Sequence, residues 1–300
     1  MSISVHTNAP DWFREAVATP QTDYFIEVNG SKIHYVRWLD DNSSNKTPTK
    51  KPGLLFVHGG GAHSHWWDFI APSFMDKYSV AAIDIFGMGD SDHLDEYLLS
   101  DHADAMIAVS DACGFGDDKI IVSHSFGGFC TLKTAAMYPE QLKGVVIVDT
   151  VLSPQFLEQE KDQKEGGFKP RKVYPSMEDA MLRFKLLPAQ PCENDYILDY
   201  IGRHSLMEVE DGVMWKFDHL FGPKTDTREL KNDIPGIKCN TTVMHGEQSL
   251  FFKPDSIEFM RDLYGSHVPF VSVPDSQHHV FLDQPIEFTK SLKAVLSQWD

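Results

Sequence analysis

The sequence predicts an α/β protein built on one mostly parallel sheet, and three observations support this fold class. Short apolar runs rich in β-branched residues alternate with segments of helical periodicity, which is the pattern of parallel βαβ units. Asn29-Gly30 separates two apolar runs near the N-terminus, which predicts an antiparallel hairpin there. The alternation stops over residues 152–230 and then resumes, which predicts a helical cap inserted into the sheet domain.

Each predicted element follows from its local pattern. The hairpin strands are expected over 24–28 and 33–39, and the polar stretch 40–52 predicts an exposed loop. Buried strands are predicted at 54–57, 80–85, 120–122, 145–148, 241–244 and 270–273. Helices are predicted at 101–113, 129–137, 254–263 and 285–299. Residues 1–151 and 231–300 are therefore expected to form the core domain, and 152–230 the inserted cap.

The composition excludes several classes of partner. Asp and Glu number 44 against 27 Lys and Arg among 300 residues, and the resulting net charge of −17 disfavours nucleic acid and anionic membranes. The first residues have neither a basic segment nor an apolar core, and no apolar run could span a bilayer. Four cysteines without CxxC spacing indicate free thiols in a reducing compartment. We therefore expect a cytoplasmic protein whose partner is a small molecule, and self-association stays open.

The segment Ile120–Gly128 carries the most specific chemical signal. A strand runs into Ser125, and Gly127-Gly128 open a helix directly after it. This is the pattern of a nucleophile elbow, in which a sharp strand-to-helix turn exposes the serine hydroxyl above the sheet. The turn needs small residues two positions before and after the serine, and these are Ser123 and Gly127. A Ser/Gly-rich turn without a catalytic role is the alternative interpretation.

Three further motifs accompany this turn, in a fixed order along the chain. They are His58-Gly59-Gly60-Gly61 after a strand, Phe86-Gly87-Met88-Gly89-Asp90-Ser91, and a late histidine before Asp283-Gln284-Pro285. Together with the Ser125 motif they resemble the α/β-hydrolase family over nearly the whole chain. The resemblance implies that Ser125 is the nucleophile and that the N–H groups of Gly60 and Phe126 form an oxyanion hole. It implies no metal and no organic cofactor.

The resemblance also implies a catalytic histidine five residues before the aspartate of the Asp-x-Pro element. Counting back from Asp283 gives His278, with His279 as the alternative. Most of the other histidines are expected to have no catalytic role. His63 and His65, close to Trp66, are interpreted as pocket residues rather than metal ligands, because a third ligand is not evident.

The acid of the triad requires a choice between two positions. The commoner family position, after the strand at 241–244, holds Ser249, which cannot carry a negative charge. Some relatives carry the acid one strand earlier, and there the strand at 145–148 ends in Asp149, 24 residues after Ser125. Asp149 is the predicted acid. Asp255 is the alternative, although a helix start explains its charge equally well.

These residues predict a serine hydrolase that cleaves carboxylic esters or related acyl compounds through an acyl-enzyme. The aromatic residues Trp66, Trp215 and Phe217 are expected to line the substrate pocket. Two alternatives stay open: a carbon–carbon bond hydrolase with the same three residues, and a hydrolase-like binding protein without turnover. Haloalkane dehalogenase and epoxide hydrolase chemistry is disfavoured, because those relatives use an aspartate nucleophile at the elbow.

Overall fold

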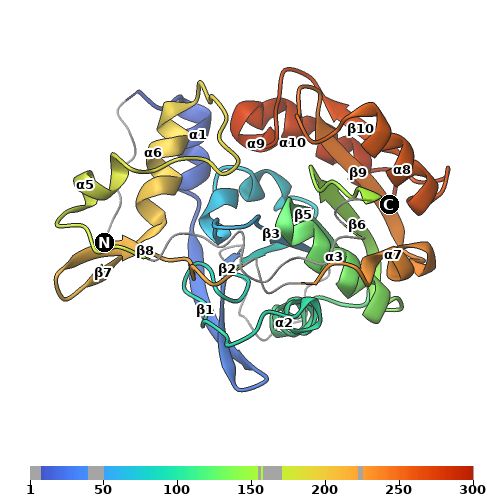
Figure 1. Cartoon of the computed structure of the whole chain (residues 1–300), viewed down its shortest axis with the longest axis horizontal. Helices are drawn as coiled ribbons and strands as arrows, with labels where there is room; N and C mark the ends of the chain where they lie inside the picture. Colours follow the sequence, from blue (N-terminus) through green and yellow to red (C-terminus); the bar gives the residue numbers. More distant parts are fainter. Residues whose placement is uncertain (1–7, 40–50, 155–156, 158–170, 222–225, 300) are drawn as a thin grey trace.

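A computed structural model describes residues 8–39, 51–154, 157, 171–221 and 226–299 (Figure 1). Its centre is an eight-stranded sheet in the order β1-β2-β4-β3-β5-β6-β9-β10, in which β1 and β2 form an antiparallel hairpin and β2 pairs antiparallel with β4. All other pairs are parallel, so the predicted fold class is confirmed. The strands are β1 Gln21–Val28, β2 Ser31–Trp38, β3 Gly53–Val57, β4 Ser79–Ile83, β5 Lys119–His124, β6 Leu142–Val148, β9 Asn240–Gly246 and β10 Phe270–Val273.

Helices cover both faces of the sheet and bury two separate apolar cores. Successive residues of β3 show the division, because Leu55 and Val57 face one core while Leu54 and Phe56 face the other. Both faces are buried, which explains why the parallel strands read as continuous apolar runs. Helices α2 Leu99–Ala112, α3 Phe126–Met137, α7 Leu230–Asp233 and α8 Pro254–Tyr264 pack on the first core, and α1 Asp11–Val17, α9 Val280–Asp283 and α10 Pro285–Leu296 on the second.

The inserted region contains helices α5 Met177–Met181 and α6 Asp195–His204 and, in addition to the expected helices, a hairpin of β7 Leu206–Val209 and β8 Gly212–Trp215. It has a small core of its own, formed by Ala180, Leu206, Val213 and Trp215. Helix α6 lies beside α1 in Figure 1, and Tyr200 of α6 packs its ring 5.6 Å from that of Phe13. The insert is therefore joined to the sheet domain by an apolar contact.

Several element boundaries differ from the prediction by a few residues. Strand β5 continues to His124 and α3 begins at Phe126, so only Ser125 lies between them. The polar stretch predicted as a loop lies largely outside the described residues, since 40–50 are not described. Within the described part of the chain, none of the helices has both the length and the apolar character needed to cross a bilayer.

Candidate active site

Ser125 occupies a strained turn between β5 and α3. Its backbone angles are φ 51° and ψ −120°, a region that non-glycine residues rarely adopt and that is found mainly at functional sites. The turn leaves no room for side chains around it, because a Cβ on Gly127 would lie 2.4 Å from the carbonyl oxygen of His58. Ser123 is tolerated because its small side chain is fully buried beside the Val146 carbonyl, 3.5 Å away.

Three loops at the carboxyl edge of the sheet bring Ser125, His278 and Asp149 together. The Ser125 Oγ lies 3.0 Å from His278 Nε2, and His278 Nδ1 lies 2.8 Å from Asp149 Oδ1. Because a carboxylate only accepts, Nδ1 carries the proton and Nε2 presents its lone pair to the serine hydroxyl. The arrangement can withdraw a proton from Ser125 while Asp149 stabilises the charge that forms on the ring.

Asp149 is held by three donors. The N–H of Gly246 donates to Oδ2 at 2.9 Å, and Ser249 Oγ donates to Oδ1 at 2.8 Å, beside the bond from His278. Ser249, at the commoner position that the family resemblance gives for the acid, therefore donates to Asp149, the predicted acid. Asp255 lies exposed in the first turn of α8, and the structure brings Asp149, not Asp255, to His278.

His124 fixes the backbone of His278 through a hydrogen bond, a contact that the sequence does not predict. Its Nε2 donates to the backbone carbonyl of His278 at 2.9 Å, and the two ring centres are 4.8 Å apart. Burial, with the neighbouring His278 and His279, holds the pKa of His124 well below its usual range, so the ring is neutral. No sequence signal identifies this contact, because 153 residues lie between its two partners.

The glycine loop after β3 passes close to Ser125. A Cβ on Gly59 would lie 3.1 Å from the Cβ of Ser125, and one on Gly60 would lie 3.8 Å from the Cβ of Phe126. His58 fixes the start of this loop, since its Nε2 accepts from the N–H of Ile85 at 3.1 Å and its Nδ1 donates to the Gly59 carbonyl at 2.7 Å. The backbones of Gly60 and Phe126, the two residues expected to form the oxyanion hole, thus lie next to each other.

A family model of the alpha/beta hydrolase fold matches residues 52–285, most of the chain. The chain belongs to the α/β-hydrolase family. It is similar to an esterase of Mycobacterium tuberculosis, with 26% identity over 82% of this chain and 83% of that protein. It is 29% identical to a haloalkane dehalogenase of Sphingobium indicum, of which it spans only 46%. Among solved structures, the thioesterase domain from the curacin biosynthetic pathway superimposes with a TM-score of 0.73 at 19% identity, over 92% of this chain and 99% of that domain.

In this α/β-hydrolase the second histidine of the pair, His279, points away from Ser125. His279 Nε2 lies 3.4 Å from the carbonyl of Pro188, and its ring packs 5.6 Å from that of Trp66. Burial lowers the pKa of His279 to about 3. The structure therefore places His278, rather than His279, beside Ser125.

The insert is tied to the loop that carries His278. Gln190 donates to both carboxylate oxygens of Asp283, at 2.9 and 2.8 Å, and accepts from the N–H of His279 at 3.0 Å. Asn194 donates to the Leu282 carbonyl at 2.7 Å. The same Asp283 accepts from the N–H of Gln277, one residue before His278. Gln190 thus fixes the backbone on both sides of His278, directly at His279 and through Asp283 at Gln277.

Aromatic side chains surround the site, although not all those expected to line a pocket face it. Phe221 packs 4.5 Å from Phe126, and Phe251 packs 5.0 Å from His278. Trp66 is buried against His279, and Trp215 belongs to the core of the insert. Phe217 packs between that small core and the first core of the sheet domain. Phe251 is partly exposed beside His278 and is therefore better placed to contact a substrate than Trp215, whereas Phe221 is buried in the first core.

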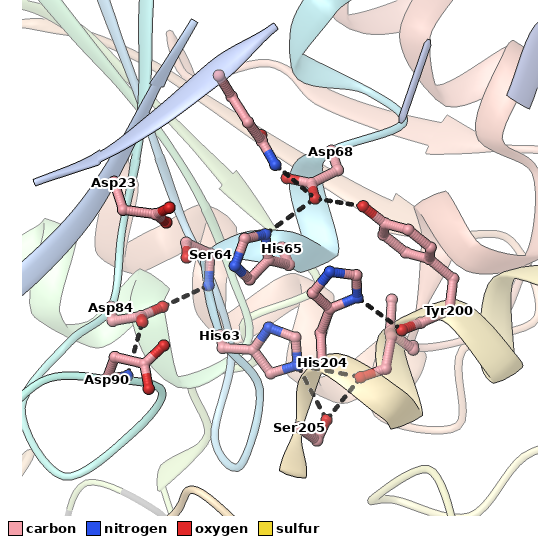
Figure 2. Close-up of polar contacts among 12 residues, drawn as sticks. Asp23, His63, Ser64, His65, Asp68, Asp84, Asp90, Tyr200, His204 and Ser205 are labelled. Carbon is pink, nitrogen blue, oxygen red and sulfur yellow. Dashed lines mark hydrogen bonds and ion pairs between the residues drawn. The ribbon is translucent and has the colours of Figure 1, made fainter. Parts of the chain in front are cut away.

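A charged cluster links the N-terminal hairpin to the end of β4, with His34 and Asp84 buried and Asp23 exposed. His34 lies 2.7 Å from Asp84 through Nδ1 and 3.1 Å from Asp23 through Nε2. Burial works against protonation, but the hydrogen bonds to Asp23 and Asp84 outweigh it and raise the pKa of His34 to about 10. Asp84 also accepts from the N–H groups of Ser64 and Asp90, as Figure 2 shows. The cluster joins the N-terminal hairpin to the segments that follow β3 and β4.

Proposed function

We propose that this protein is a serine esterase that hydrolyses carboxylic esters through an acyl-enzyme. The observation that carries the proposal is the continuous hydrogen-bond chain from Ser125 through His278 to Asp149. The strained elbow adds support, because backbone strain of this kind costs about 1–3 kcal/mol and persists where function requires it. The side chain of Ser125 is partly exposed, so a substrate can reach it.

The proposed reaction has two steps. Ser125 Oγ attacks the ester carbonyl carbon while His278 Nε2 takes its proton, and the ring then gives that proton to the departing alcohol. Water next attacks the acyl carbon and gives a proton to His278, which returns it to Ser125 Oγ as the carboxylic acid leaves. The N–H groups of Gly60 and Phe126 are the proposed donors to the oxyanion in both steps.

The nucleophile distinguishes this proposal from the chemistry of other relatives. Ser125 has a hydroxyl, whereas dehalogenase and epoxide hydrolase chemistry uses a carboxylate nucleophile at this turn. The similarity to an esterase over 82% of the chain is consistent with an ester substrate. The partly exposed Phe251 beside His278 favours an apolar ester over a charged one. We further propose that the segment 152–230 is the cap that closes over this substrate.

The test is active-site labelling combined with an ester panel. A fluorophosphonate probe should label the parent protein and not Ser125→Ala, because only an activated serine attacks phosphorus. Hydrolysis of p-nitrophenyl esters should fall by several orders of magnitude in that variant with circular dichroism unchanged. A protein that is neither labelled nor active on any ester would contradict the proposal. Cleavage of a β-diketone without ester hydrolysis would instead indicate a carbon–carbon hydrolase.

A further inference from the structure

Three histidines form a second cluster at the junction between the sheet domain and the insert (Figure 2). His63 and His65 belong to the short helix η1 Ser64–Trp67 and the residue before it, and His204 ends α6. Their ring centres are separated by 4.5 Å (His65–His204), 5.8 Å (His63–His65) and 6.5 Å (His63–His204). None of these side chains takes part in the hydrogen-bond chain of the proposed esterase.

Each ring has one nitrogen committed to an acceptor. His65 Nδ1 donates to the carboxylate of Asp68 at 2.9 Å, and His204 Nδ1 donates to the Tyr200 carbonyl at 2.9 Å. His63 Nε2 lies 2.9 Å from Ser205 Oγ, whose own proton goes to the carbonyl of Ile201. His63 is therefore the donor in that bond. Burial lowers the pKa of His63 and His204. Burial also opposes protonation of His65, but Asp68 outweighs it and raises the pKa of His65, so His65 must lose a proton before it can bind a metal. Once all three rings are neutral, the lone pairs of His63 Nδ1, His65 Nε2 and His204 Nε2 are available.

This is the pattern by which proteins prepare histidines for a metal. A metal-binding imidazole usually donates its other N–H to a carboxylate or a backbone carbonyl, which fixes the ring and its tautomer. His63 is 2% exposed, and its Nδ1 has no hydrogen-bond partner among the described residues, a cost that a bound cation would remove. Asp68 is itself fixed by donors from Gln21 at 3.2 Å and Tyr200 at 2.7 Å.

The spacing of the rings suits one ion. Zinc binds imidazole nitrogen at about 2.0–2.1 Å, so three rings around a tetrahedral zinc have centres roughly 5 Å apart. The observed separations bracket this value. One donor atom each of His65, Asp68 and His204 lies within 4.8 Å of the others, a group that contains the hydrogen bond from His65 to Asp68 and does not contain His63. The carboxylate of Asp68 is thus placed to orient His65, and binding of one ion by all three histidines would draw the His63 ring closer to the other two.

The geometry points to a transition-metal site formed by His63, His65 and His204, with Asp68 orienting His65. Its ligand would be a divalent ion that prefers imidazole, of the zinc, copper or nickel class. Because η1 belongs to the sheet domain and α6 to the insert, the ion would cross-link the two. His63 lies two residues after the glycine loop, so the cross-link would also restrain the proposed oxyanion hole.

The test is calorimetric titration of chelator-treated full-length protein with ZnCl₂, followed by thermal unfolding with and without zinc. We expect one ion per chain and a higher Tm with zinc, since a ligand that binds only the folded state stabilises it. His204→Gln and His63→Gln should each weaken binding at least tenfold, and Asp68→Asn by about 10- to 100-fold. Circular dichroism shows whether each variant is folded. If one of the two histidine variants does not fold, the other still tests the site.

A second group of imidazoles supplies the matched control. His124, His278 and His279 also lie within 4.8 Å of one another, at the proposed catalytic site. His278→Gln and His279→Gln should therefore bind zinc as the parent does. The proposal is overturned if these variants abolish binding while His204→Gln retains it, or if the parent shows no saturable binding up to millimolar zinc.

Discussion

Replacement of Asp149 by asparagine tests the proposed mechanism most directly, because it keeps the shape of the side chain and removes its charge. Asp149 accepts from Gly246 through one oxygen and from His278 and Ser249 through the other. An asparagine has only one carbonyl oxygen, so its NH₂ must face either Gly246 or His278. Both orientations are unfavourable, for different reasons.

If the NH₂ faces His278, Nδ1 must accept, and the proton moves to Nε2. The ring then donates to Ser125 and cannot take its proton, which removes general-base catalysis. If the NH₂ faces the Gly246 N–H instead, two donors meet in a buried place, and an unsatisfied group there costs about 1–3 kcal/mol. In that orientation the ring keeps its tautomer and loses the carboxylate charge that stabilises its protonated form. We therefore expect kcat to fall by about 10² to 10⁴, or roughly 3–5 kcal/mol in activation free energy.

The assay is steady-state hydrolysis of a p-nitrophenyl ester, with circular dichroism and urea unfolding to verify the fold. Asp255→Asn is the matched control, since Asp255 lies exposed at a helix start and its loss should cost only a few tenths of a kcal/mol of stability. An Asp149→Asn variant that keeps a third or more of the parent kcat would refute the reasoning. An inactive, folded Asp255→Asn would do so as well.

Three further predictions concern neighbouring groups. Ser249→Ala removes one donor to Asp149 and should lower kcat roughly tenfold with little change in KM, measured in the same ester assay. His278→Ala should lose several orders of magnitude in kcat, whereas His279→Ala should keep most of its activity. The reverse result would identify His279 as the general base. His34 has a pKa of about 10 in the folded protein against 6.5 for the free side chain, so unfolding releases a proton between these pH values. The free energy of unfolding, measured by urea denaturation, should therefore fall as the pH rises from 6.5 toward 10. In His34→Gln this free energy should depend less on pH, and an unchanged pH dependence would contradict the prediction.

The parts of this protein that local backbone geometry dictates could be predicted from sequence. The elbow requires a glycine at 127 because a carbonyl oxygen fills the place of its Cβ, and that requirement is visible in the residues themselves. Asp149 could be predicted to lie near the histidine because the carboxyl ends of parallel strands meet at one edge. The hairpin of β7 and β8 also left a signal, because Glu210-Asp211 joins two short apolar runs and Gly212 opens the second strand.

Other features depend on contacts between distant segments and leave no local pattern. The bond from His124 to the His278 carbonyl requires both β5 and the loop after β10 to be in place. Trp215 was expected to line a pocket because it is aromatic, yet it fills the core of the insert, since its own region needed an apolar centre. Only the packing of the insert decides between those two environments.

The hydrogen bonds from Gln190 and Asn194 to the loop after β10 have a consequence for protein engineering. An inserted cap is often treated as a cassette that can be exchanged between relatives to change selectivity. In this protein, Gln190 and Asn194 of the insert also fix the backbone around His278, through their bonds to Asp283 and Leu282. A grafted cap that lacks these two amides would alter turnover together with selectivity, so the junction for an exchange should be drawn after residue 194, inside the insert.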